Sequence, residues 1–305
     1  MTITKEHCEV EYQLGKRLQQ LATGCQLTCH GITMTRRLEK DKSQRVADEF
    51  SATRDSVRSS KKVLDSHHPA LRRITTILNE ARAAWYYRTF SYQEGVRLIR
   101  LDVLPKLRDE IFKLKEALAV AVNELRDAWD SIREDAKQRL GELFDDEDYL
   151  SPPTGVSIDL SFPSVEADKR LLDILPEVYD QERERVRLQF EQAAAEAQRT
   201  LLEEFVQSIQ HLKERLTDTG NEKKIIRESA VNAIHEFAHK FRTLSIVDSQ
   251  EIRELTDKAM EVAESINVQT LRANYEYRDK VKEELNTMIA AVEVIAAPKR
   301  KFELE

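Results

Sequence analysis

The feature that most constrains the fold of this chain is a run of apolar residues spaced three or four apart between residues 103 and 149. Its regularly spaced members are Ile111, Leu114, Leu118, Val122, Leu125, Trp129, Ile132, Ala136 and Leu140. This spacing places the side chains on one face of an α-helix. We therefore predict a single helix roughly 55–60 Å long. Its apolar face must be covered by other helices, because helical propensity alone does not stabilise such a helix in water.

The composition also favours long helices over loops. Charged residues make up 34% of the 305 residues, whereas only seven glycines and seven prolines are present to interrupt helices. So few glycines leave little material for phosphate-binding loops, and we expect no cofactor. The sequence has no run of about 18 apolar residues that could cross a membrane. The first residues, MTITKEHCEVEYQL, lack the apolar core of a secretion signal. We therefore expect a cytoplasmic protein that has no membrane partner.

The same spacing argument assigns the rest of the chain to helices and two strands. Helices are expected at residues 5–22, 40–64, 71–88, 166–216 (with Pro176 as a candidate break), 222–244 and 250–296. Alternating apolar residues predict strands at 25–35 and 156–162, which we expect to pair with each other. The predicted fold is mostly α: long antiparallel helices in a bundle or coiled-coil rod, with a minor two-stranded β ribbon.

Charge divides the chain unevenly. Residues 1–108 contain 20 Lys and Arg against 12 Asp and Glu, whereas the remainder contains 28 against 43. We therefore distinguish a basic N-terminal helical region with one strand (1–102), a central long helix plus strand (103–162) and an acidic C-terminal long-helix region (163–305). The imbalance indicates either a basic surface for nucleic acid or complementary surfaces that meet within or between subunits.

A basic stretch followed by aromatic residues is the candidate nucleic-acid site. The basic candidates are Arg36, Arg37, Lys40, Arg45, Arg58, Lys61 and Lys62, and the aromatic candidates are Trp85, Tyr86 and Tyr87. Lys and Arg neutralise phosphates, and aromatic rings stack on unpaired bases. In the alternative reading, Trp85 belongs to the core and the arginines pair with nearby acids. Those acids are Asp41, Asp48, Glu49 and Asp55.

One short motif is typical of a zinc site. His235 and His239 are four residues apart on a predicted helix, so both imidazoles share a face, and Glu236 is placed to polarise a bound water. Candidate third ligands are Glu251, Glu254 and Glu261. The charged Lys240 follows the second histidine where metallopeptidases of this kind carry an apolar residue. A helix rich in His and Glu also produces this pattern by chance.

Residues 36–150 resemble a family of tailed-phage and prophage proteins whose function is not established. The matching positions are Lys62, Leu64, Arg82, Thr89, Gly95, Arg97, Leu140, Gly141, Leu143, Phe144, Asp148 and Tyr149. Two departures are Phe90-Ser91-Tyr92 in place of Leu-Pro-Trp and Leu150 in place of Pro. The resemblance implies a phage origin and a helical fold, and it implies no activity.

These observations predict a phage-encoded, non-enzymatic assembly or interaction protein that forms a homo-oligomer. A second phage or host protein is another candidate partner. The first alternative function is a single-stranded nucleic-acid-binding accessory factor in replication or recombination. The second alternative is a zinc-dependent hydrolase that uses His235, Glu236 and His239.

Overall fold

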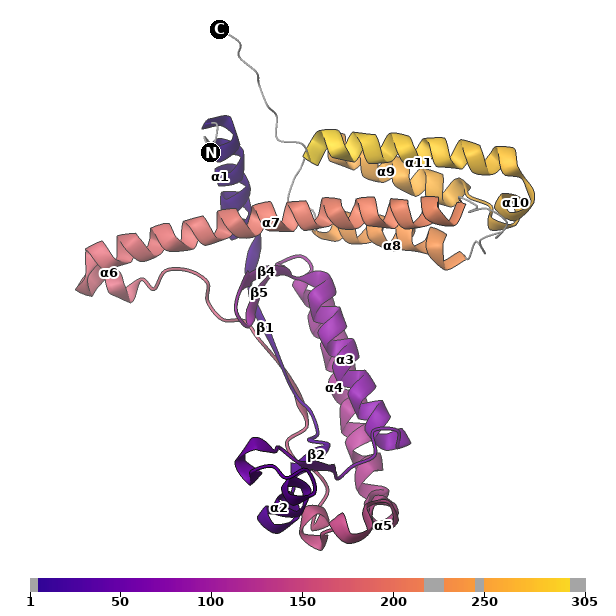
Figure 1. Cartoon of the computed structure of the whole chain (residues 1–305). Coiled ribbons are helices and arrows are strands. Elements are labelled where there is room, and N and C mark those ends of the chain that lie inside the picture. Colours follow the sequence, from indigo (N-terminus) through magenta and orange to yellow (C-terminus); the bar gives the residue numbers. More distant parts are fainter. Residues whose placement is uncertain (1–4, 217–227, 245–249, 297–305) are drawn as a thin grey trace. The chain divides into compact units, whose positions relative to one another are not determined.

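The computed structural model describes residues 5–216, 228–244 and 250–296. The chain is mostly helical and has a small antiparallel sheet (Figure 1). It divides into two compact units that are each built from separate stretches of sequence. Unit 1 comprises Met1–Gln26, Tyr87–Leu104 and Phe162–Glu305, and unit 2 comprises Leu27–Tyr86 and Pro105–Ser161. These units cut across the three consecutive regions that charge distinguishes in the sequence.

Unit 1 is built around α7, which has 41 residues. Its helices are α1 (Lys5–Leu21), α6 (Arg170–Ile174), α7 (Pro176–Leu216), α8 (Glu228–Leu244), α9 (Gln250–Ser265), α10 (Val268–Ala273) and α11 (Tyr275–Ala296). Helices α1, α8 and α11 pack on α7, and α9 packs on α8 and α11 (Figure 1). The apolar stripe of α7 is the centre of the core, where Phe190, Ile209 and Leu212 are buried.

The crossing of α1 and α7 depends on a glycine. A Cβ atom at Gly15 would lie 2.8 Å from the Cα of Glu191, which is closer than real Cβ atoms approach a backbone. Gly15 therefore lets the backbones of the two helices come into contact. Leu18, which lies on the next turn of α1, is fully buried. Any larger residue at position 15 must push the helices apart.

The sheet has four strands in the order β4-β5-β1-β6. The strands are β1 (Ala22–His30), β4 (Phe90–Gln93), β5 (Val96–Arg100) and β6 (Ser157–Ser161). The strand predicted at 25–35 is present in part, as β1, and it is adjacent to β6, which corresponds to the strand predicted at 156–162. The sheet has four strands instead of the expected two. Residues 92–101 form most of a β4–β5 hairpin, turning at Gly95 with φ +75°. Arg97 holds this hairpin, because its guanidinium donates to the Thr89 hydroxyl at 2.7 Å and carbonyl at 2.8 Å.

Unit 2 contains two further long helices. Its elements outside the four-stranded sheet are β2 (Thr35–Arg37), α2 (Lys40–Glu49), η1 (Arg54–Ser56), β3 (Ser60–Lys62), α3 (Pro69–Arg88), α4 (Leu104–Asp127), α5 (Trp129–Leu140), η2 (Gly141–Leu143) and η3 (Asp146–Tyr149). An ion pair between Arg73 and Glu124 joins α3 to α4. Leu71 of α3 is buried, as are Ile111 and Leu125 of α4, which the sequence predicted to be inward.

Three predicted helices are shorter than expected. The central helix is interrupted at Ala128, which divides it into α4 and α5. The predicted helix 40–64 ends at Glu49, and its remainder forms η1 and β3. The predicted helix 250–296 is three helices, because the Asn267 side chain accepts from the amides of Gln269 and Thr270 and starts α10. The candidate break at Pro176 is confirmed, since α7 begins there.

Among the described residues, no helix is both long enough and apolar enough to cross a membrane. In the sequence, Asp248 or Ser249 is placed to cap the predicted helix 250–296, and Ile226 and Ala230 belong to the apolar face of the predicted helix 222–244. These caps and the side chains of Ile226 and Ala230 lie outside what the structure describes. The remaining apolar residues of that face, which the same spacing predicts to be inward, are buried in α8: Ile234, Phe237, Ala238 and Phe241.

We predict that Phe190→Ala lowers the free energy of unfolding by about 3–5 kcal/mol, because it leaves a cavity where the buried ring of this α7 residue fills the core. The ring lies 5.2 Å from that of Tyr92, and the residue is 1% exposed. Urea denaturation followed by circular dichroism measures the change. Leu188→Ala on the same helix is the control, because Leu188 is 44% exposed. Equal losses in the two variants would contradict this account of the core.

Candidate functional site

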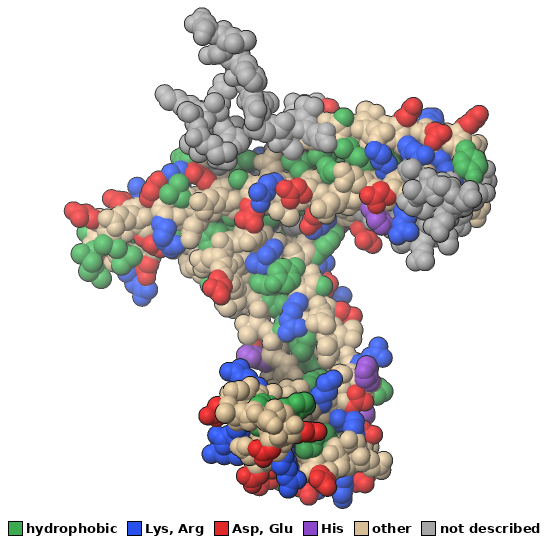
Figure 2. Space-filling view, viewed as in Figure 1, with side chains coloured by type: hydrophobic (Ala, Val, Ile, Leu, Met, Phe, Trp, Pro, Cys, Tyr) green, Lys and Arg blue, Asp and Glu red, His purple; other side chains and the backbone are tan. Residues whose placement is uncertain are grey.

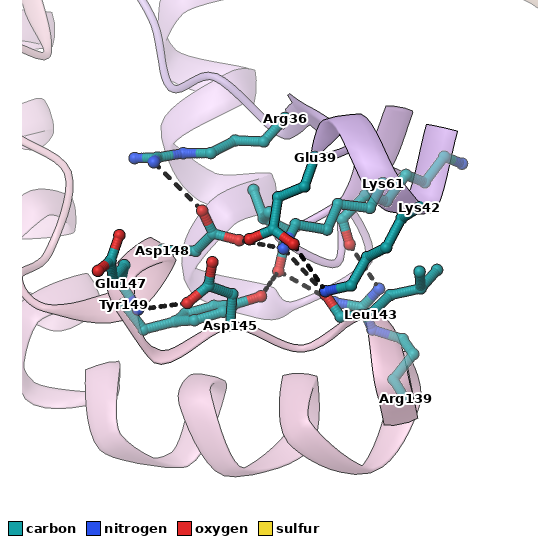
Figure 3. A network of polar contacts seen from close by, with 12 residues as sticks. Arg36, Glu39, Lys42, Lys61, Arg139, Leu143, Asp145, Glu147, Asp148 and Tyr149 are labelled. Atoms are coloured by element: carbon teal, nitrogen blue, oxygen red, sulfur yellow. Dashed lines mark hydrogen bonds and ion pairs between the residues drawn. The ribbon is translucent and has the colours of Figure 1, made fainter. Parts of the chain in front are cut away.

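A buried ion pair fixes the inner face of the small β2–β3 sheet (Figure 3). In this antiparallel pair Arg36 lies opposite Lys61, so the two side chains share a face. The Lys61 Nζ atom lies 2.7 Å from Asp148 Oδ2 and donates to the Leu143 carbonyl at 2.9 Å. Arg36 approaches the other oxygen of Asp148 at 3.2 Å. The side chains of Lys61 and Asp148 are only 4% and 6% exposed, so Lys61 has a structural role.

Further hydrogen bonds anchor β3 to the segment after α5. The Tyr149 hydroxyl donates to the Val63 carbonyl, and burial raises the pKa of Tyr149, which keeps the hydroxyl protonated as a donor. The Arg139 guanidinium donates to the carbonyls of Lys62 at 2.9 Å and Val63 at 3.1 Å. Trp129 Nε1 donates to the Tyr149 carbonyl at 3.1 Å. The backbone of β3 is therefore held by contacts with residues far away in the sequence.

The outer face of the β2–β3 sheet is exposed and basic. Because side chains alternate along strands, Arg37 and Lys62 point away from Asp148, together with the hydroxyl residues Thr35 and Ser60. All four residues are exposed. Three more exposed cations flank this face in the chain: Lys40, Arg45 and Arg58. We call Arg37, Lys40, Arg45, Arg58 and Lys62 the outer cations.

The outer cations have no carboxylate partner within 4.0 Å among the residues that the structure describes. The alternative reading paired such arginines with nearby acids. In this segment Arg54 does pair with Asp55, at 3.5 Å, and Asp48 accepts from the Gln44 amide at 2.7 Å. The remaining acids leave the outer cations unpaired, so these cations can meet an external anion without displacing an internal partner.

The aromatic candidates do not join this basic surface. Trp85 is 7% exposed and packs in unit 2, so its ring cannot stack on a base. Tyr86 is 57% exposed, but it lies near the end of α3, about 25 Å along the helix from Pro69. Tyr87 belongs to unit 1, where its hydroxyl donates to the Glu236 carbonyl at 3.4 Å. The aromatic and basic residues of the predicted nucleic-acid site therefore do not form one surface.

Sequence reasoning missed Phe50, the residue that follows α2. It is 74% exposed, the most exposed of the large aromatic side chains among the described residues. A helix running to residue 64 would have placed Phe50 in its apolar stripe. The helix ends at Glu49 instead, and Ser51 takes a positive φ of 51° that turns the chain. No local sequence signal distinguishes these two outcomes.

The histidine motif lies on α8 as expected. His235 is half-buried, whereas Glu236 and His239 are exposed. The neighbouring Lys240 pairs with Glu204 at 2.5 Å and lies 5.5 Å from the centre of the Tyr87 ring. Among the described residues, no group of three His, Cys, Asp or Glu side chains is placed to hold a metal ion. Of the candidate third ligands, the Glu251 side chain lies outside what the structure describes.

A second exposed surface lies on unit 1, where α6 meets the start of α7. Leu172, Ile174, Leu175 and Val178 are 48%, 72%, 54% and 41% exposed. Figure 2 shows the hydrophobic side chains gathered over α6. We call these four residues the α6–α7 apolar cluster. The sequence analysis did not single out these four residues.

We predict that Asp148→Asn lowers the free energy of unfolding of unit 2 by about 3–5 kcal/mol, because the Lys61 ammonium is left buried and uncompensated. Adding Lys61→Met to this variant should restore part of the loss. Urea denaturation measures both effects. Asp146→Asn is the control: it removes an exposed ion pair with Arg133 and should change the stability little. A similar loss from Asp146→Asn would contradict a special role for Asp148.

The chain was compared with known protein families, curated proteins and solved structures. No family model matches the chain, and no match was found among curated proteins or among solved structures. The functional conclusion therefore depends on the surfaces themselves.

Proposed function

We propose that this chain is a non-enzymatic helical interaction protein that self-associates through the α6–α7 apolar cluster. The observation that carries this proposal is the exposure of four large apolar side chains within seven residues. Burying apolar surface contributes about 25 cal/mol per Å², so covering the cluster is favourable. Contiguous exposed apolar patches of this kind mark interaction sites more often than isolated exposed residues do.

The charges beside the cluster favour a second copy as the partner. The exposed Lys169 precedes the cluster in the chain and the exposed Glu177 lies near its end, whereas Arg170 and Asp180 already pair with Asp168 and Arg183. In a two-fold symmetric contact the same patch meets itself, so residue i of one copy faces residue j of the other. Such a contact can bring Lys169 of one copy against Glu177 of its partner. The cluster is thus complementary to itself in polarity, and one pair of opposite charges is available to fix its geometry.

We also propose that the helices around α7 act as one bundle that presents the cluster. Leu201, Phe205, Ile209 and Leu212 of α7 are buried in the same core as residues of α8, α9 and α11. Shared burial of this kind stiffens a long helix, because each helix covers the apolar stripe of its neighbours. The start of α7 then extends from a packed body and carries the cluster on a defined element.

A phage origin, which the resemblance of residues 36–150 implies, is part of the same proposal. The matching residues serve the fold: Arg97 holds Thr89, and Tyr149 and Asp148 hold β3. Such roles support a shared architecture and indicate no reaction.

The zinc-hydrolase alternative predicts a bound metal ion instead of an apolar contact. Stoichiometric zinc in the purified protein, lost when His235 and His239 are replaced, would favour it over our proposal.

We predict that the wild-type protein is a homo-oligomer at micromolar concentration and that Ile174→Lys/Leu175→Lys makes it monomeric. The added ammonium groups would have to be buried in the contact, at a large cost in desolvation. Size-exclusion chromatography with light scattering measures the mass. Phe112→Lys/Val120→Lys is the matched control, because both residues are exposed on α4 in unit 2. A monomeric wild-type protein would overturn the proposal.

A charge exchange tests the two-fold geometry. Lys169→Glu and Glu177→Lys should each weaken association, since each places like charges together in the contact. Combining the two substitutions should recover the wild-type dissociation constant, measured by sedimentation equilibrium. If the combined variant associates more weakly than either single variant, Lys169 and Glu177 do not face each other across the contact.

A further inference from the structure

We infer that the outer face of the β2–β3 sheet is a binding surface for single-stranded nucleic acid, in which the outer cations contact phosphates and Phe50 stacks on a base. This inference is independent of self-association, because the surface belongs to unit 2 and the apolar cluster to unit 1. It also differs from the site expected from sequence, since it excludes Lys61, Trp85 and Tyr87 from contact.

The basic residues of this segment divide into anchors and contacts. Lys61 is buried on Asp148, and Arg36 approaches the same carboxylate, so both are committed to the inner face. Figure 3 shows this pair of contacts converging on Asp148. Arg37 and Lys62 are the strand neighbours of these anchors and point the opposite way. The buried network therefore fixes the backbone that carries the exposed cations.

The segment that carries this face is basic. Residues 36–62 contain nine Lys and Arg against five Asp and Glu, in a chain of net charge −7. Local positive charge in an acidic protein attracts a polyanion only where acids do not neutralise it. The outer cations meet this condition, because none has a carboxylate within 4.0 Å among the described residues. A phosphate backbone supplies the missing negative charge.

The outer face places two of its cations close together. Arg37 and Lys62 occupy diagonal positions on neighbouring strands, roughly 7–8 Å apart. Both long side chains can therefore reach one sugar–phosphate backbone. The exposed hydroxyls of Thr35 and Ser60 lie on the same face, and hydroxyl groups commonly donate to phosphate oxygens. The face offers cations and neutral donors together.

An exposed aromatic side chain favours a single strand over a duplex as the ligand. Phe50 follows α2, which carries Lys40 and Arg45, and its ring is 74% exposed. An exposed aromatic ring gains by stacking on an unpaired base, whereas the bases of a duplex already stack on each other. Figure 1 shows α2 beside β2 within unit 2, so the aromatic residue and the basic face belong to one small module.

The test measures the binding of a fluorescently labelled oligothymidine to the full chain by anisotropy at several salt concentrations. We expect Arg37→Ala/Lys62→Ala to raise the dissociation constant about tenfold at low salt and to reduce the slope of log K against log salt by about 1.4. Lys106→Ala/Lys113→Ala is the matched control. It removes two exposed cations from α4 in the same unit and should change neither quantity appreciably.

A second pair of variants tests stacking. Phe50→Ala should weaken binding at least about fivefold with an unchanged salt slope, because stacking on a base involves no ion release. Phe112→Ala removes a ring that is 61% exposed on α4 and should leave binding unchanged. All substituted residues are exposed, so circular dichroism should show the wild-type fold in each variant.

Three results would overturn the inference. The first is no binding of oligothymidine at low salt. The second is an equal loss of affinity in the Arg37/Lys62 and Lys106/Lys113 variants, which would indicate an unlocalised electrostatic attraction. The third is tighter binding of a duplex of the same length, combined with no effect of Phe50→Ala, which would leave unpaired bases without a role.

Discussion

Burial of the apolar stripe of α7 is the constraint on which the larger unit depends. A helix of 41 residues with Phe190, Phe205 and Leu212 on one face cannot remain alone in water. Helices from both ends of the sequence cover this stripe: α1 from the N-terminal part, and α8 and α11 from the C-terminal part. Gly15 makes the first of these contacts close enough to pack.

Unit 2 depends on a polar contact in addition to its apolar core. The Lys61–Asp148 pair is nearly excluded from water, and such a pair costs desolvation that only good geometry repays. Here Leu143, Tyr149 and Arg139 supply the surrounding hydrogen bonds to β3 and its neighbours. The result is a small sheet whose backbone is fixed and whose opposite face stays in solvent. A rigid, exposed, basic face is what a binding surface requires.

The two proposed surfaces share one physical logic. Each consists of side chains whose natural partners are missing from the described part of the chain: apolar residues without cover at α6, and cations without acids on the β2–β3 sheet. Folding satisfies groups of both kinds elsewhere, as at Leu212 in the core and at Lys61 on Asp148. The groups left unsatisfied therefore mark where an external molecule gains the most free energy by binding.

The sequence alone determined which faces of the long helices are buried. Ile111, Leu125 and Phe237 are inward because a three-four spacing acts within one helix and needs no knowledge of its partner. Only the tertiary structure decided the rest. Lys61 is buried because Asp148, distant in the chain, lies opposite it, and Phe50 is exposed because α2 ends at Glu49. The β4–β5 hairpin likewise joins a sheet through β1. Such contacts depend on which segments meet in space, and the spacing of residues within one segment does not predict its contacts with another.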